Sequence, residues 1–416
     1  MLPTGTNRQA IVRGACSVGA ALTVLASCSG SLWPWGGEGE GHPVSQSQPP
    51  FDGAVLTREA LDRSLVLGRQ YMLSSQRPEG NFVYEYDFVQ RRQIRDDNDV
   101  RQAGALWGLA LLHHDSPSEE TARAIMKGLE FFKECSQLTP GGRRYIVYPG
   151  SAIGNTGTVA LVALTLVDFL RAGWAVPSAE DYKADLAEYM GFVVSLRMAD
   201  GHFHRQYQLT DGQGMGRASP YSDGEALLLM VKAAKYSGHT GLKRLTLQSA
   251  EQMYRNNIQG ALERDPDSDT TKGFYQWGSM AYYELYTSDW PGVDEFAGRV
   301  IYMAYWMIDV HKMLSRRRNT GYAHEGLAVA WELARLTGRE EAAEKIGRAI
   351  DAGLAKLIAW QVGGPMPNKY LKKHRTSDAL AVGGVMNAAD DPVLRIDVTQ
   401  HQMHATILAR RFLYRP

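Results

Sequence analysis

The residues of this chain that could do chemistry gather at six places, each at the start of an apolar stretch rich in small residues. The most informative acid is Glu325 in AHEGLAVAWELA, because no Ser, Thr, Asp or Asn stands three positions before it to form a capping box. Burial raises the pKa of an unpaired carboxyl group, and a general acid must be protonated at neutral pH. We therefore predict Glu325 as a general acid, with an ion pair to His324 or to an arginine as the structural alternative.

Two further carboxylates, Asp223 and Glu225, begin the stretch SPYSDGEALLLM at residues 219–230. Glu225 follows Ser222 by three positions, which matches a capping box. The local sequence does not separate this capping role from contact with a substrate. In a catalytic role, Glu225 or Asp97 would be the base or nucleophile, because paired carboxylates can provide the acid and base of glycosidic chemistry.

A third set of charged residues is spaced for contact on single helix faces. Asp397 and His401 are four positions apart, and an acid that orients an imidazole makes a base. An intrahelical ion pair is the alternative, and His404 lies one turn further along. Arg101, four positions after Asp97, would bind an acidic group such as a uronic acid, or pair with an acid of the protein.

Aromatic and amide side chains occur at the same six places. Aromatic faces stack on sugar rings, and amides fix the positions of hydroxyl groups. Packing in the core is the alternative for each aromatic residue, and Trp277, expected at the start of a helix, is the best single candidate for stacking. The predicted substrate-binding residues are Asn155, Tyr221, Trp277, Tyr322 and Gln400.

The sequence lacks the G-x-S-x-G, Walker, dinucleotide-binding and H-E-x-x-H motifs. Its 45 basic and 45 acidic residues balance, so the charge gives no indication of nucleic-acid binding. Asp397, His401 and His404 lack a further clear ligand motif, and His202 and His204 are only an alternating pair. We predict neither a metal ion nor another cofactor.

The rest of the chain, residues 55–416, shows helical periodicity in twelve segments of two alternating kinds. Six are amphipathic, with charges on one face, and six contain more small residues and less charge, which suits burial on all sides. The amphipathic segments are 57–76, 118–135, 178–197, 241–258, 294–314 and 338–360. The others are 97–114, 154–170, 222–238, 275–288, 320–338 and 395–414.

This alternation predicts an all-α (α/α)6 toroid, with the amphipathic helices outside and the small-residue helices inside. The inner helices would run in one direction, so that their N-termini line one mouth. Short β-like runs at 80–94, 141–149 and 200–212 predict hairpins at that mouth. Thr57, Ser118 and Ser178 are predicted to cap the first three outer helices.

The predicted architecture resembles that of α/α-toroid carbohydrate-active enzymes. Examples are the unsaturated glucuronyl hydrolases, the N-acylglucosamine epimerases and the helical domain of glucuronyl C5-epimerases. The resemblance covers about residues 55–416 and lies in the architecture, and no family motif accompanies it.

This resemblance implies a glycan or another anionic polymer as partner, and hydrolysis by paired carboxylates is the leading expectation. A polysaccharide lyase or sugar epimerase with a histidine or tyrosine base is the first alternative. The second is a non-catalytic lipoprotein that binds a polymer during synthesis or export, together with other envelope biosynthesis proteins.

The first 28 residues have the pattern of a bacterial signal peptide, with Arg8 and Arg13 before the apolar run GACSVGAALTVLAS. The run ends in LASC, which resembles the lipobox of bacterial lipoproteins. This resemblance implies a lipid on Cys28 and a membrane-anchored protein of the cell envelope, on the periplasmic side. Ser29 implies sorting to the outer membrane, and the Gly-, Ser- and Pro-rich residues 29–54 are predicted as a flexible tether.

Overall fold

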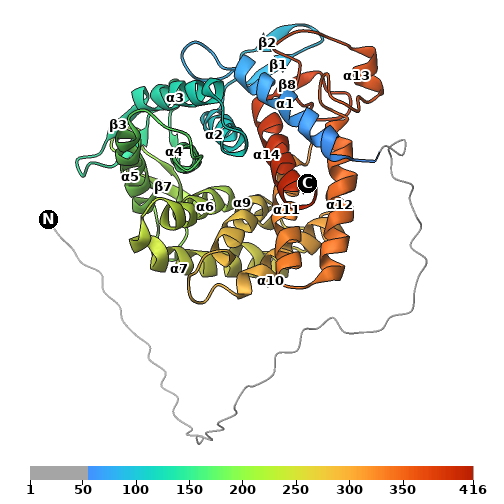
Figure 1. Cartoon of the computed structure of the whole chain (residues 1–416). Helices are drawn as coiled ribbons and strands as arrows, with labels where there is room; N and C mark the ends of the chain where they lie inside the picture. The colour runs from blue at the N-terminus through green and yellow to red at the C-terminus, as the bar shows by residue number, and fades with distance from the viewer. Residues whose placement is uncertain (1–54, 416) are drawn as a thin grey trace, which may run out of the picture. The chain divides into compact units, whose positions relative to one another are not determined.

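The computed structural model describes residues 55–415, which form a closed ring of helices (Figure 1). The predicted signal peptide, Cys28 and the tether lie outside the described residues. Within the described range, none of the helices is both long enough and apolar enough to cross a bilayer.

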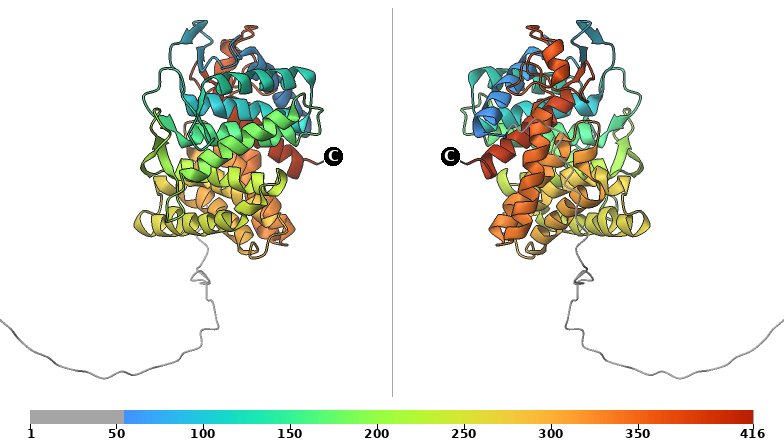
Figure 2. Two further views of the ribbon diagram at one scale, coloured as in Figure 1. Left: turned by 90° about the vertical axis from the view of Figure 1, so that its left-hand side faces the viewer. Right: turned by 90° about the vertical axis from the view of Figure 1, so that its right-hand side faces the viewer.

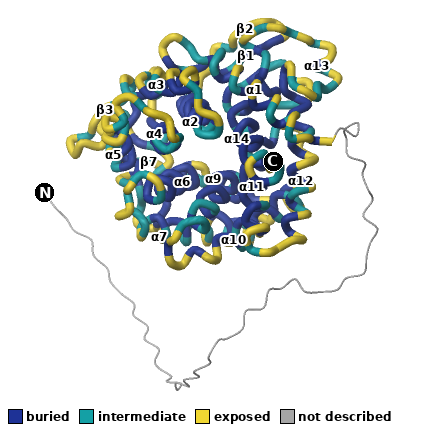
Figure 3. The backbone as a smooth tube through the Cα atoms, in the orientation of Figure 1, coloured by how far each residue is buried: buried dark blue, intermediate teal, exposed yellow. Residues whose placement is uncertain are grey.

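Six helices form an inner ring, in which each helix packs against the next and the last returns to the first. They are α2 (Asp99–Asp115), α4 (Thr156–Leu170), α6 (Pro220–Tyr236), α9 (Asp269–Tyr286), α11 (Gly321–Leu336) and α14 (Ile396–Phe412). Every residue of α4 except the last is buried. Figure 3 shows the same predominance of buried residues around the ring, as expected for helices that are apolar and small on all faces.

Six helices form the outer ring, and the predicted (α/α)6 toroid is confirmed. They are α1 (Arg58–Ser74), α3 (Glu119–Glu134), α5 (Ala179–Ser195), α7 (Lys243–Met253), α10 (Glu295–Tyr305) and α12 (Glu340–Ile358). Two of them continue in π-helical turns, η2 (Tyr254–Gln259) after α7 and η3 (Trp306–Val310) after α10. The shorter elements are η1 (Thr240–Leu242), α8 (Gly260–Arg264), η4 (Met313–Ser315) and α13 (Lys369–Lys373).

Two of the three predicted N-caps are confirmed. The hydroxyl of Thr57 accepts the amide of Ala60, and that of Ser118 accepts the amide of Thr121, each at 3.2 Å. The prediction for Ser178 is wrong, because its backbone is left-handed, with φ of 56°, and its side chain makes no capping bond. A capping side chain needs the extended backbone that Thr57 and Ser118 have.

Short antiparallel strands connect the helices. The described strands are β1 (Glu85–Asp87), β2 (Arg92–Ile94), β3 (Ser136–Leu138), β4 (Arg144–Ile146), β5 (Gly154–Asn155), β6 (His204–Tyr207), β7 (Gly214–Ala218) and β8 (Val393–Arg395). Strand β1 pairs with β2 in the predicted hairpin and also with β8, and β6 lies between β5 and β7. Since β5 leads directly into α4 and β8 into α14, these sheets lie where the inner helices begin, away from the C-terminus (Figure 2). We call this end of the ring the mouth.

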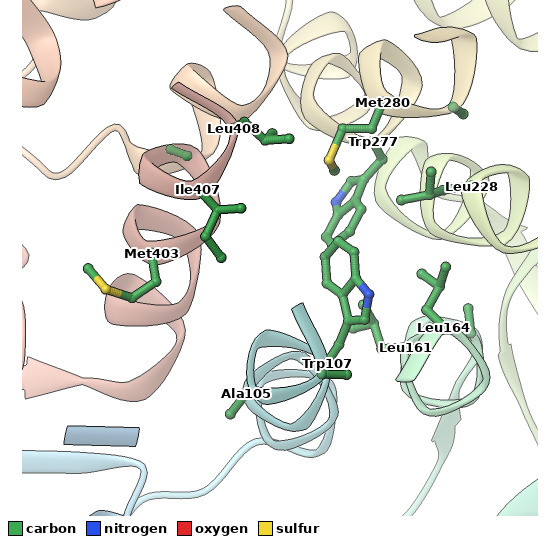
Figure 4. Packing of buried hydrophobic residues seen from close by; sticks show 14 of the residues in the cluster. Ala105, Trp107, Leu161, Leu164, Leu228, Trp277, Met280, Met403, Ile407 and Leu408 are labelled. Atoms are coloured by element: carbon green, nitrogen blue, oxygen red, sulfur yellow. The ribbon is translucent and has the colours of Figure 1, made fainter. Parts of the chain in front are cut away.

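Two tryptophans fill the axis of the ring at mid-depth. Trp107 of α2 and Trp277 of α9 come from helices that stand opposite each other in the ring order, and their ring centroids are 5.5 Å apart. Figure 4 shows the two indoles reaching toward each other among leucine and methionine side chains. The pair separates the mouth from a second space at the end where the inner helices finish.

Candidate functional site

Glu325 is the centre of a three-residue cluster behind the mouth. It lies in the second turn of α11 and is fully buried. Its Oε1 is 3.3 Å from Nδ1 of His401 and 3.0 Å from Nδ1 of His404, both on the neighbouring helix α14. Its Oε2 is buried and has no hydrogen-bond partner among the described residues.

The prediction that Glu325 has a raised pKa is wrong. Burial alone raises the pKa of this carboxyl group, but His401 and His404 outweigh burial and lower it. The alternative pairing with His324 is wrong as well, because His324 faces Gly353 of α12 and burial lowers the pKa of its imidazole to about 3. Glu325 is therefore ionised at neutral pH and suited to hold an imidazole, not to donate a proton.

His401 is the member of the cluster that reaches the mouth. About a quarter of its side chain, 24%, is exposed, against 7% for His404. Burial lowers the pKa of His401, but the Glu325 carboxylate outweighs burial and raises it. Gln276 Nε2 lies 3.1 Å from Nδ1, and Trp277 stands edge-on to the ring at 6.3 Å. Because Nδ1 faces Glu325, Nε2 is left to meet a substrate.

Asp397 does not orient His401, contrary to the prediction. Its carboxylate lies 2.7 Å from Arg395 Nη2 and 3.0 Å from Arg101 Nε. A guanidinium group offers several N–H donors to a carboxylate, so Asp397 pairs with the two arginines and not with the imidazole of His401 one helical turn away. Arg101, which was expected either to bind an acidic group or to pair with an acid of the protein, forms its ion pair with Asp397 and not with Asp97, and 38% of its side chain is exposed.

Glu225 is the acid of the mouth that is protonated at neutral pH, as a proton donor must be. Helix α6 begins at Pro220 with Ser219 at the N-cap position, so the predicted capping box at Ser222 does not exist. Glu225 is 4% exposed in the second turn, and a side chain at Gly157 would collide with its carboxyl group. Burial and then the charge of Asp99 raise the pKa of Glu225 to about 8.

The other carboxylates at the mouth are occupied by donors of the protein. Asp99 accepts the side-chain amide of Asn155 at 3.0 Å and the hydroxyl of Thr158 at 2.7 Å. Asp97 accepts bonds from Gln102 and Tyr148, both at 2.7 Å. The amide of Asn155, predicted to bind substrate, thus supports Asp99.

Asp223, the other acid of the stretch at 219–230, has a structural role. It is fully buried and accepts bonds from His202 at 2.6 Å, from the amide of Phe203 at 3.0 Å and from Asn257 at 3.0 Å. These bonds attach the segment before β6 and the helical turn η2 to α6. Within residues 55–415, no group of three or more His, Cys, Asp or Glu side chains is placed to hold a metal ion.

The predicted aromatic residues divide into exposed and buried sets. Tyr221 is 50% exposed in the first turn of α6, and Tyr322 is half-buried in the first turn of α11. Trp277 is only 5% exposed, because α9 begins at Asp269 and not near Trp277 as predicted. Gln400, which was predicted to bind substrate, is buried against Gly108 and packs in the contact between α14 and α2.

Sequence reasoning placed His404 near the site but missed its bond to Glu325 and the position of Gln276 beside His401. Both contacts join helices that are far apart in the chain, and no local spacing reports them. The available signal was the three-residue step from His401 to His404, which gives both imidazoles one direction on α14.

No protein-family model matches the sequence, and no curated protein matches it either. Solved structures do match its fold. A sugar epimerase from a ruminal bacterium has a TM-score of 0.57 at 11% identity, over 85% of this chain and 98% of that one. A D-mannose isomerase has a TM-score of 0.58 at 11% identity, over 88% of this chain and 100% of that one. The GH76 α-mannanase of Bacteroides thetaiotaomicron has a TM-score of 0.55 at 10% identity, over 86% of this chain and 97% of that one. The fold is that of the α/α-toroid carbohydrate-active enzymes.

Proposed function

We propose that the mouth is the active site of an enzyme that transfers protons on a carbohydrate. His401 is the base, Glu325 holds it, and Glu225 is the acid. The observation that carries this proposal is the bonding of one buried carboxylate to His401 and His404. A second carboxyl group in the inner ring, that of Glu225 in the second turn of α6, stays protonated up to about pH 8. A base and an acid of different chemical type at one mouth suit acid–base catalysis.

The reaction that fits is isomerisation or epimerisation beside a carbonyl group. The base takes the proton from the carbon next to the carbonyl of the open-chain sugar, and the electron pair of that C–H bond forms an enediol. Glu225 gives its proton to the carbonyl oxygen, and the ionised Glu325 stabilises the imidazolium of His401. In the second step the Glu225 carboxylate takes back a hydroxyl proton of the enediol, which re-forms a carbonyl group. A proton delivered to the neighbouring carbon, with the carbonyl now on the first carbon, yields an isomer, and a proton delivered to the first carbon on its other face yields an epimer. The similar folds of a sugar epimerase and a D-mannose isomerase support this class.

Hydrolysis, the leading expectation from the sequence, is the second candidate. The raised pKa of Glu225 favours it, because a protonated carboxyl group can protonate a glycosidic oxygen. Its base or nucleophile would be Asp97 or Asp99, and both are already bonded to donors of the protein. The similar fold of an α-mannanase supports this candidate, and the engaged carboxylates make it the weaker one.

One experiment separates the candidates. The purified protein is incubated in D2O with reducing sugars, with neutral oligosaccharides and with uronic-acid polymers, and the products are read by mass spectrometry and NMR. Deuterium on the carbon next to the carbonyl, without new chain ends, indicates proton transfer; new reducing ends indicate hydrolysis. His401→Gln is expected to abolish deuterium incorporation. Binding to one polymer with no turnover of any substrate would refute both and leave a polymer-binding protein.

We further propose that Cys28 carries the lipid that anchors the protein at the periplasmic side of a bacterial envelope. The support is the LASC sequence after an apolar run. Growth with a fatty acid that carries a clickable tag should label the wild-type protein and not Cys28→Ser, and fractionation should move the variant out of the membrane. Equal labelling of both proteins would rule the anchor out.

A further inference from the structure

The second space along the axis is a cavity of about 200 Å3 at the end where the inner helices finish. We call it the rear cavity. Trp107, Leu228 and Met280 lie on its inner wall, and the charged side chains at its wall are Asp168, Arg171, Lys232, Glu284 and Arg411. His404 lines it too, and this ring bonds Glu325 through Nδ1.

Both acids of the rear cavity accept hydrogen bonds from donors of the protein. Asp168, 1% exposed, accepts bonds from Lys232 at 2.6 Å, from Trp107 Nε1 at 2.8 Å and from Arg171 at 3.3 Å. Glu284 accepts bonds from Lys235 at 2.8 Å and from the hydroxyl of Tyr236. Each acid thus already has its partners.

The cations of the rear cavity have donors to spare among the described residues. Lys232 is 5% exposed, and its ammonium group makes one hydrogen bond although it carries three protons. Arg171 makes one side-chain hydrogen bond and lies 3.7 Å over the ring of Tyr236. Arg411 has a single acidic neighbour, Asp115 at 3.9 Å. Donors without acceptors around a cavity are the arrangement that binds an oxyanion.

The direction of the helices explains only part of this charge. The carbonyl ends of helices favour cations, and Arg171 follows the last turn of α4 while Arg411 lies in the last turn of α14. Lys232 does not fit this account, because it lies a full turn before the end of α6 and its side chain is buried. A buried ammonium group is costly, so its spare donors beside a cavity call for a partner.

We propose that the rear cavity binds a small oxyanion, a carboxylate or a phosphate, between Lys232, Arg171 and Arg411. Water in the liquid occupies roughly 30 Å3 per molecule, so the space takes an ion with a few carbon atoms and excludes a polymer. The apolar wall suits the carbon atoms of an organic acid. This inference does not depend on the proposed function of the mouth.

The test uses the purified full-length protein and isothermal titration calorimetry. Inorganic phosphate, acetate and glucuronate are titrated separately at constant ionic strength, so the arms distinguish a phosphate from a carboxylate ligand. Saturable binding of at least one ion is expected, with Kd raised at least tenfold in Arg171→Gln and in Arg411→Gln. Lys232 is left intact, because its loss would strand the buried Asp168.

Two control variants make the result decisive. Arg348→Gln removes a cation whose side chain is 72% exposed on the outer helix α12, and it should leave Kd unchanged. Arg101→Gln removes the exposed cation of the mouth, and it should also leave Kd unchanged. Binding that disappears in Arg101→Gln but persists in both rear variants would overturn the proposal, as would the absence of saturable binding by all three ions.

Discussion

The mouth and the rear cavity are two ends of one ring, and they carry opposite electrostatics. At the mouth, burial and then the charge of Asp99 keep Glu225 protonated. At the rear, the acids are bonded to donors of the protein and the cations have spare donors. All six inner helices begin at the mouth, where the positive ends of their dipoles favour carboxylates, and end at the rear, where the negative ends favour cations. The direction of the helices therefore biases which chemistry each end can support.

The largest expected effect contrasts the two histidines bonded to Glu325. His401→Gln should lower kcat/KM by about 10²- to 10⁴-fold, the usual worth of a general base, because His401 faces the mouth. His404→Gln should lower it by roughly tenfold, since His404 faces the rear cavity and only positions Glu325. Steady-state kinetics on the substrate found in the screen measures both. Equal losses would show that the two ends are not functionally distinct.

A second prediction removes the barrier between the two ends. Trp107→Ala should lower the free energy of unfolding by about 3–5 kcal/mol, because the side chain is 1% exposed and packs against Trp277. Denaturant unfolding monitored by circular dichroism measures the change. Trp174→Ala, at a tryptophan that is 36% exposed, is the matched control and should cost about 1 kcal/mol or less. Similar costs for both would mean that the axial tryptophans do not pack as described.

A third prediction concerns the pH dependence that Glu225 gives the mouth. Its pKa rises from 4.5 to about 8 on folding, so the folded state binds more protons between these values and loses stability as the pH rises through them. Between pH 5 and pH 9, the free energy of unfolding of the wild type should fall by roughly 2–4 kcal/mol relative to that of Glu225→Gln, since one pKa unit is worth about 1.4 kcal/mol. Denaturant unfolding of both proteins at each pH measures this difference. Parallel stability curves for the two proteins would show that Glu225 titrates normally.

The smallest expected effect is at the exposed aromatic rim of the mouth. Tyr221→Ala should raise KM about fivefold and leave kcat unchanged, because one aromatic contact is worth on the order of 1 kcal/mol. Tyr302→Ala, at a 40% exposed tyrosine of the outer helix α10, should change neither constant. A fall in kcat for Tyr221→Ala would instead place this ring next to the reacting atoms.

The fold could be predicted because its signal is local. A segment with charges on one face is an outer helix, and a segment with few charges on any face is an inner helix. This pattern can be recognised within each segment alone. The start of α9 was misplaced because TTKGF, before Tyr275, has little apolar character and yet continues the helix from Asp269. Burial of Thr271 and Phe274 in the closed ring, a tertiary effect, extends the helix there.

The sequence could predict many of the residues at the site, but not which of these residues bond to one another. Sequence spacing suggested Asp397 with His401, while the fold pairs Asp397 with arginines and His401 with Glu325. Lys232 in ALLLMVKAAK and Asp168 in LTLVDFL were each a charge within an apolar inner helix. Such isolated charges indicate that a partner exists, but the ring order is needed to say which one.

The closure of the ring has a consequence for the folding of the protein. Helix α14 packs against α1, α2 and α11, and β8 adds to β1, so the final segment joins the beginning of the ring to its end. Without this last segment, the first five inner helices would form an open arc whose apolar flanks face water. The native state therefore waits for the last residues, and until they join the ring the arc is exposed to aggregation and proteolysis. A nonsense mutation even a few turns from the end would leave an unclosed chain and not a slightly shortened enzyme.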